Sequence, residues 1–224
     1  MDFTAAKVAI VINSNATSEH ALTHLIDSLK MDMRYKNYKI IVFIGGFYDL
    51  SDYEFETNDN ITYIKCNYNS LDMTSFIALS ELHSNDVENK YLCLHDTCKV
   101  GNKFFDMIEK INFENMTSIR INKKFSNNIG FYSQKIINQN KPFLQSIKTN
   151  AKIDIEFKKM IVGYEDVIFK NDKNNVLLDN YDNWQYTGPT DYYNTGTMRI
   201  VEHYPNLDLY KIKANWGSGW TVKL

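Results

Sequence analysis

The chain has 224 residues, of which 44% are hydrophobic and 23% charged, and its formal net charge is −2. A chain of this size and composition can bury a core as one domain, which excludes a disordered, collagen-like or coiled-coil protein. Because the chain has no excess of basic residues, nucleic acid is a poor expected partner.

Three cysteines without a CxxC pair (Cys66, Cys93 and Cys98) indicate free thiols in a reducing compartment. The N-terminus lacks a basic leader and the longest apolar run, residues 8–12, is too short to span a bilayer, so we expect a soluble cytoplasmic protein with no transmembrane segment.

The N-terminal half alternates predicted strands with predicted helices. Residues 7–13 contain a continuous apolar run, 8–12, between polar residues, which is typical of a strand buried on both faces. Apolar residues at helical spacing follow Ser18, a candidate N-cap, and predict a helix to about Arg34. The same order returns in predicted strands at 38–47, 61–66 and 91–94 and predicted helices at 72–83 and 102–111. This alternation predicts an α/β fold with a Rossmann-like, mostly parallel central sheet flanked by helices over residues 1–116.

The alternation breaks after residue 116. Residues 117–121 and 199–204 are strand-like, 130–138 are mixed and 153–169 are helix-like. Residues 117–224 are therefore expected to form an α+β half that holds a second substrate. No stretch has linker composition and no internal repeat occurs, so both halves are assigned to one domain, 1–224.

Ligands of a parallel sheet bind outside the carboxyl ends of its strands, where backbone amides and helix N-termini converge. The polar residues expected there are Asn13, Ser14, Asp72, His95 and Asp96. Asp96 directly follows a predicted strand, so its carboxylate suits a divalent cation or a ribose hydroxyl. The alternative is that Asp96 caps the next turn. Asp72 likewise suits sugar or ribose hydroxyls, or serves as a helix N-cap.

Two features of the C-terminal half carry candidate chemistry. The adjacent carboxylates Glu165 and Asp166 suit a general base and its electrostatic neighbour, or they form an exposed acidic turn. His203, in a strand-like segment, is a candidate metal ligand or a partly buried core residue. Cys98 is a poor thiol nucleophile beside His95, because neighbours at a strand end point apart.

Three common motifs are missing from the sequence. It contains no GxxxxGK[ST] and no GxSxG, and the turn after residues 7–13 is not GxGxxG. These absences disfavour a P-loop enzyme, an α/β-hydrolase and a dinucleotide-dependent dehydrogenase.

Taken in chain order, the motifs resemble those of small GT-A glycosyltransferases, particularly the single-domain enzymes of large DNA viruses and bacteria. Residues 91–98 are placed like the DxD strand end, and 128–133 resemble the G-x-Y-S segment that faces donor or acceptor. Residues 164–167 resemble the xED motif, and 199–204 are placed like the late strand whose His completes a metal site. The resemblance spans about residues 7–204. It departs from the family at Cys98, which stands where the second carboxylate of DxD is expected.

The resemblance implies transfer of a sugar from a UDP- or GDP-linked donor to a hydroxyl of a glycan or glycoconjugate. It implies that Asp166, or otherwise Glu165, is the catalytic base. It implies that Mn²⁺ or Mg²⁺ is held by Asp96 and His203, and that the nucleotide sugar is bound by Asn13, Ser14, Asp72, His95 and Asp96. Five aromatic residues are expected either to stack against sugars or to pack over the core: Trp184, Tyr186, Tyr192, Tyr193 and Trp216.

Two other functions remain open from the sequence. A sugar nucleotidyltransferase shares the Rossmann-like half, although its usual Gly-rich basic loop after the first strand is missing here. A non-catalytic glycan- or nucleotide-binding module of the same fold fits the incomplete DxD. Donor hydrolysis separates such a module from the enzyme.

Overall fold

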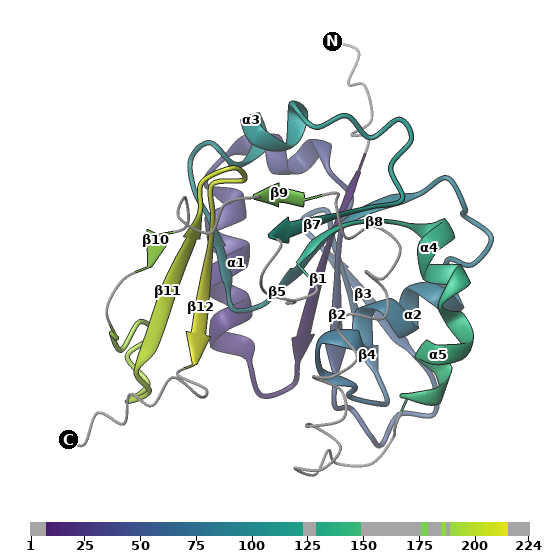
Figure 1. Cartoon of the computed structure of the whole chain (residues 1–224). Coiled ribbons are helices and arrows are strands. Elements are labelled where there is room, and N and C mark those ends of the chain that lie inside the picture. The colour runs from purple at the N-terminus through teal and green to yellow at the C-terminus, as the bar shows by residue number, and fades with distance from the viewer. Residues whose placement is uncertain (1–7, 123–128, 149–175, 179–184, 187–188, 215–224) are drawn as a thin grey trace.

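The computed structural model describes residues 8–122, 129–148, 176–178, 185–186 and 189–214. They form an α/β structure with a large central sheet, helices on both of its faces and a smaller second sheet (Figure 1). Within these ranges no helix is both long enough and apolar enough to cross a membrane. The predicted helix at 153–169, with Glu165 and Asp166, lies outside the described residues, as do Trp184 and Trp216.

The large sheet has the strand order β3-β4-β2-β1-β5-β8-β7-β9. Strands β4, β2, β1, β5, β7 and β9 run in one direction, and β3 and β8 run in the other. The carboxyl ends of β1, β2, β4 and β5 therefore lie at one edge, and the predicted mostly parallel sheet is confirmed. The strands are β1 (Ala9–Asn15), β2 (Ile40–Gly45), β3 (Glu54–Asn58), β4 (Ile61–Cys66), β5 (Lys90–His95), β7 (Ser118–Asn122), β8 (Gly130–Ser133) and β9 (Val176–Leu178).

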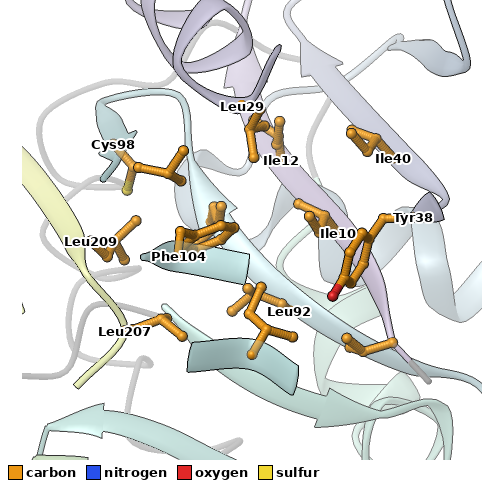
Figure 2. Close-up of a cluster of buried hydrophobic side chains, with 14 of the residues drawn as sticks. Ile10, Ile12, Leu29, Tyr38, Ile40, Leu92, Cys98, Phe104, Leu207 and Leu209 are labelled. Carbon is orange, nitrogen blue, oxygen red and sulfur yellow. The ribbon is translucent and has the colours of Figure 1, made fainter. Parts of the chain in front are cut away.

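The sheet is buried on both faces because successive side chains of its central strands point to opposite sides. Ile10 and Ile12 of β1 belong to one core cluster, and Val11 between them belongs to the other. Figure 2 shows the first cluster, in which Ile10 and Ile12 meet Leu29 of α1 and Phe104 of α3. The second cluster lies against α2, α4 and α5. The helices are α1 (Glu19–Lys30), α2 (Thr74–Leu82), α3 (Phe104–Glu109), α4 (Gln134–Gln139) and α5 (Lys141–Ser146), with 3₁₀ turns η1 (Met33–Asn37) and η2 (Leu71–Met73).

The second sheet is antiparallel, with the order β10-β11-β12-β6. Its strands are β10 (Gln185–Tyr186), β11 (Arg199–Tyr204), β12 (Leu209–Ala214) and β6 (Cys98–Val100). The chain leaves the large sheet at His95 and enters the small one at Cys98, so Asp96 and Thr97 connect the two sheets. Cys98 and Leu209 join the first core cluster (Figure 2), and this shared core places β12 beside the end of β5.

The structure adds strands that the sequence patterns do not predict. β3 lies in the polar stretch before Asn60, and all five of its residues are exposed. It pairs with β4 through a turn at Asp59 and Asn60, whose φ angles of 49° and 67° are left-handed, a conformation that Asn and Asp tolerate better than most residues. An edge strand with no buried face carries no hydrophobic alternation to find. The first helix also ends earlier than predicted, at Lys30 rather than near Arg34, and η1 follows it.

Candidate functional site

The structure brings the predicted site residues of the N-terminal half together at the carboxyl ends of β1 and β5. Asn13 and His95 are register partners on these neighbouring parallel strands. The backbone N–H of Asp96 donates to the carbonyl of Asn13 at 3.0 Å. Asp72, in η2 just before α2, lies 3.7 Å from the His95 ring, measured from Oδ1 to Nδ1. The convergence expected from the parallel sheet is therefore present.

Asn13 has a structural role within this group. Its Nδ2 donates to the carbonyl of Leu71, and its Oδ1 accepts from the backbone N–H of Ser75, both at 2.9 Å. The second bond satisfies an N–H in the first turn of α2 that has no partner within the helix. Leu71 has a φ of 52°, which is uncommon for residues other than Gly, Asn and Asp. Asn13 thus fixes the turn that carries Asp72.

Ser14 and Asp96 form a buried pair. The Ser14 hydroxyl donates to Asp96 Oδ2 at 2.9 Å, and Asp96 is only 7% exposed. Burial raises the pKa of Asp96, although Lys211, the Ser14 hydroxyl and the Thr97 backbone each oppose that shift. The carboxylate is therefore held in one orientation by neutral donors with a cation nearby.

Lys211 is a member of the site that the sequence patterns do not identify. It comes from β12, and its Nζ lies 3.0 Å from His95 Nδ1 and also donates to Thr97 Oγ1. An ammonium group has only donors, so Nδ1 accepts this bond and the ring proton sits on Nε2. Burial, followed by the charges of Lys211 and Lys213, lowers the pKa of His95 well below 6.5, which keeps the ring neutral.

His95 therefore presents a buried donor. The residue is 6% exposed, and its Nε2 has no hydrogen-bond partner in the described part of the chain. Burying an N–H without a partner is unfavourable, and in native proteins such groups often mark a place where a ligand or water binds. The Asp72 side chain is more accessible, at 38% exposed, although burial raises its pKa against the opposing charge of Lys211.

The structure does not bring His203 to Asp96. His203 Nε2 lies 3.1 Å from Asp208 Oδ1, and its ring stacks on Tyr210 at 4.3 Å between centroids. Asp208 in turn accepts from the backbone N–H of Lys103 at 2.8 Å. Over the described ranges, no group of three or more His, Cys, Asp or Glu residues is placed to hold a metal ion. The two ligands expected for Mn²⁺ or Mg²⁺, Asp96 and His203, therefore have separate partners in this arrangement.

Cys98 is not available as a ligand or a nucleophile. It is completely buried in the first core cluster, and burial raises the pKa of its thiol to about 11. The expectation that it is a poor nucleophile agrees with this placement, because the thiolate is the reactive form.

The G-x-Y-S segment is part of the core. It forms β8, whose four residues are buried and which runs away from the carboxyl end of β5, with Gly130 opposite Cys93. Tyr132 packs edge-on against Phe76 at 4.8 Å, and Ser133 Oγ accepts from the backbone of α4 as its N-cap. A Cβ at Gly130 would lie 2.5 Å from the carbonyl of Ile119. These residues thus serve packing between strands.

The predicted stacking residues Tyr192 and Tyr193 pack onto α1. Tyr193 meets the rings of His20 and His24 at 5.1 and 5.5 Å, and Tyr192 meets His24 at 5.6 Å. The Arg199 guanidinium lies over the Tyr193 ring at 5.1 Å. Both rings thus contact protein groups and are partly buried. Tyr186 lies in β10.

Comparisons with protein-family models, with curated proteins and with solved structures find no match to this chain. Its function is therefore inferred from the residues at the edge of the large sheet and from the motifs of the sequence.

Proposed function

We propose that the chain is a glycosyltransferase of the GT-A type that transfers a sugar from a nucleoside-diphosphate donor to a hydroxyl of a glycan or glycoconjugate. The observation that carries this proposal is the gathering of Asp72, Asp96, His95 and Lys211 at the carboxyl ends of parallel strands. This edge of a parallel α/β sheet is the usual place for nucleotides. Carboxylates accept from ribose and sugar hydroxyls, and cationic or imidazole N–H groups donate to phosphate oxygens.

The chemical step of the proposal depends on the C-terminal half. Asp166 removes the proton of the acceptor hydroxyl, the oxygen attacks the anomeric carbon, and the bond from that carbon to the diphosphate breaks with inversion. The nucleoside diphosphate leaves with the bonding electron pair. This role for Asp166, with Glu165 as the alternative, is supported by the resemblance of residues 164–167 to xED.

A donor panel tests the proposed function. Purified protein is incubated with UDP- and GDP-sugars, with and without mixed glycan acceptors, and released nucleoside diphosphate is measured. We expect release from one donor, and Asp96→Asn should reduce it because the carboxylate at the end of β5 is lost. Glu88→Gln is the matched control, since Glu88 is an exposed carboxylate away from this edge. Absence of release and of nucleotide binding across the panel contradicts the proposal.

The choice of base is tested separately. Asp166→Asn preserves side-chain shape and removes the charge, so donor affinity should change little while transfer falls by about 10²–10⁴-fold. Glu165→Gln should transfer at nearly the parent rate. The opposite pattern makes Glu165 the base, and full activity in both variants removes the xED assignment.

A second candidate is a non-catalytic module of the same fold. It is favoured by Cys98, which replaces the second carboxylate of DxD and is completely buried. Tight binding of a nucleotide sugar without hydrolysis or transfer would support this candidate. Pyrophosphate release from a nucleoside triphosphate and a sugar phosphate would instead identify a sugar nucleotidyltransferase.

A further inference from the structure

A nucleotide-sugar donor brings a diphosphate whose negative charge grows as the sugar leaves, and this charge needs a counter-charge in the site. A divalent cation on Asp96 and His203 is the arrangement implied by the sequence motifs. The described residues do not form that ligand set, because His203 is held by Asp208 and Asp96 is held by Ser14. The counter-charge must therefore come from elsewhere if the donor binds at this edge.

Lys211 is the cation that the structure places there. The residue is only 7% exposed, and a buried ammonium is costly unless it is hydrogen-bonded and near opposite charge. His95 and Thr97 accept two of its three possible hydrogen bonds, and the carboxylates of Asp72 and Asp96 are close enough to interact with its charge. Both acceptors of its hydrogen bonds are neutral, so the ammonium is not neutralised by a direct ion pair with them. One N–H direction thus remains for a ligand oxygen, as far as the described residues show.

The neighbouring lysine on the same strand is arranged differently. Lys213 lies 3.1 Å from Glu202 Oε1, a direct ion pair, and its side chain is 38% exposed. Lys213 is therefore already paired and more accessible to water. A comparison of variants at Lys211 and Lys213 therefore distinguishes an effect of any positive charge on β12 from an effect of the position of Lys211.

His95 supplies an independent observation at the same edge of the sheet. Because Lys211 occupies Nδ1, the proton on Nε2 makes that atom a second donor, and it is buried without a partner in the described residues. The two ring nitrogens face opposite sides of the imidazole, so this donor serves a different oxygen of a bound ligand from the one that Lys211 binds.

We propose that Lys211 binds the diphosphate of the donor and replaces the divalent cation in this protein, while the Nε2–H of His95 donates to a further oxygen of the bound donor. The inference rests on the proposed function and specifies how its donor is held. The diphosphate leaves as an anion paired with the Lys211 side chain. Donor binding and transfer therefore proceed without an added metal.

Calorimetry on the metal-stripped full chain tests this proposal with UDP, GDP and inorganic pyrophosphate, in EDTA and then with Mn²⁺. We expect pyrophosphate and one nucleotide to bind in EDTA, with affinities that Mn²⁺ changes by less than about 3-fold. Lys211→Met should weaken both by at least about 10-fold, as expected for loss of a charge-assisted hydrogen bond. Lys211→Arg should retain more affinity than Lys211→Met, and Lys213→Met should bind like the parent.

Circular dichroism and thermal melting show whether Lys211→Met is folded. If it is not, the comparison of the parent in EDTA and in Mn²⁺ and the Lys211→Arg variant still decide the question. Imidazole ¹⁵N spectra of the free parent should show the Nε2–H tautomer for His95, and the Nδ1–H tautomer would overturn the assignment of the donor.

The outcomes separate this inference from the proposed function. Nucleotide binding that requires Mn²⁺, or Lys211→Met binding like the parent, overturns the role of Lys211 and leaves the glycosyltransferase proposal standing. Pyrophosphate binding without UDP or GDP binding supports the anion site and counts against the proposed function. Absence of binding by all three probes overturns both.

Discussion

Replacement of Asn13 by Ala tests whether this residue acts on the fold or on the ligand. The change removes two hydrogen bonds of 2.9 Å, to the carbonyl of Leu71 and from the N–H of Ser75. Ser75 is 1% exposed, so water cannot replace the partner of its N–H without local opening. A buried N–H left without a partner costs about 1–3 kcal/mol, whereas the Leu71 carbonyl still accepts from the backbone N–H of Thr74, so we expect a loss of about 1–3 kcal/mol. In a chain of this length such a loss lowers Tm by roughly 2–12 °C.

Urea unfolding followed by far-UV circular dichroism measures this loss, with an unchanged m-value as the sign that only stability has altered. Asn67→Ala is the matched control, because Asn67 is only partly buried and its side-chain bond to the carbonyl of Ser51 is long at 3.4 Å. The control should differ from the parent by less than about 0.5 kcal/mol. If Asn13→Ala is as stable as the control but loses nucleotide binding, Asn13 contacts the ligand directly and the positional role is wrong.

Three further predictions concern packing, acid stability and the thiols. Gly130→Ala should destabilise the protein by about 1–3 kcal/mol in the same urea assay, because the new Cβ would meet the carbonyl of Ile119 at 2.5 Å and adjacent strands must separate. Burial raises the pKa of Glu81, but bonds from Lys148 and Tyr53 outweigh it and hold the pKa below the usual 4.5. The stability that comes from the lowered pKa of Glu81 is present above pH 4.5 and is lost as pH falls through that lowered pKa. Glu81→Gln should therefore flatten the acid limb of a stability–pH curve. An unchanged limb would contradict the pairing of Glu81 with Lys148 and Tyr53. The native protein should not react with Ellman's reagent at pH 8, because Cys66, Cys93 and Cys98 are buried and their pKa values are raised, whereas three thiols should titrate in urea. Rapid reaction of a native thiol would show that one of them is accessible.

Elements that have a hydrophobic pattern can be predicted from local sequence. The runs at 61–66 and 199–204 match β4 and β11 residue for residue. The convergence of Ser14, His95 and Asp96 was also predictable, because the carboxyl ends of neighbouring parallel strands meet at one edge whatever the details of packing.

Tertiary structure alone decided which groups act on that edge. Lys211 is 116 positions from His95, and nothing in the local pattern of 209–214 distinguishes it from Lys213. Its placement follows from the register of β12 against β6, in which Lys211 stands opposite Cys98. The hydrogen bond between Asn13 and the first turn of α2 and the antiparallel direction of β8 likewise depend on long-range pairing. Hydrophobic periodicity shows how a segment alternates between core and solvent. Strand pairing and register depend instead on contacts between segments that are distant in sequence. Pairing and register determine which side chains meet at the site.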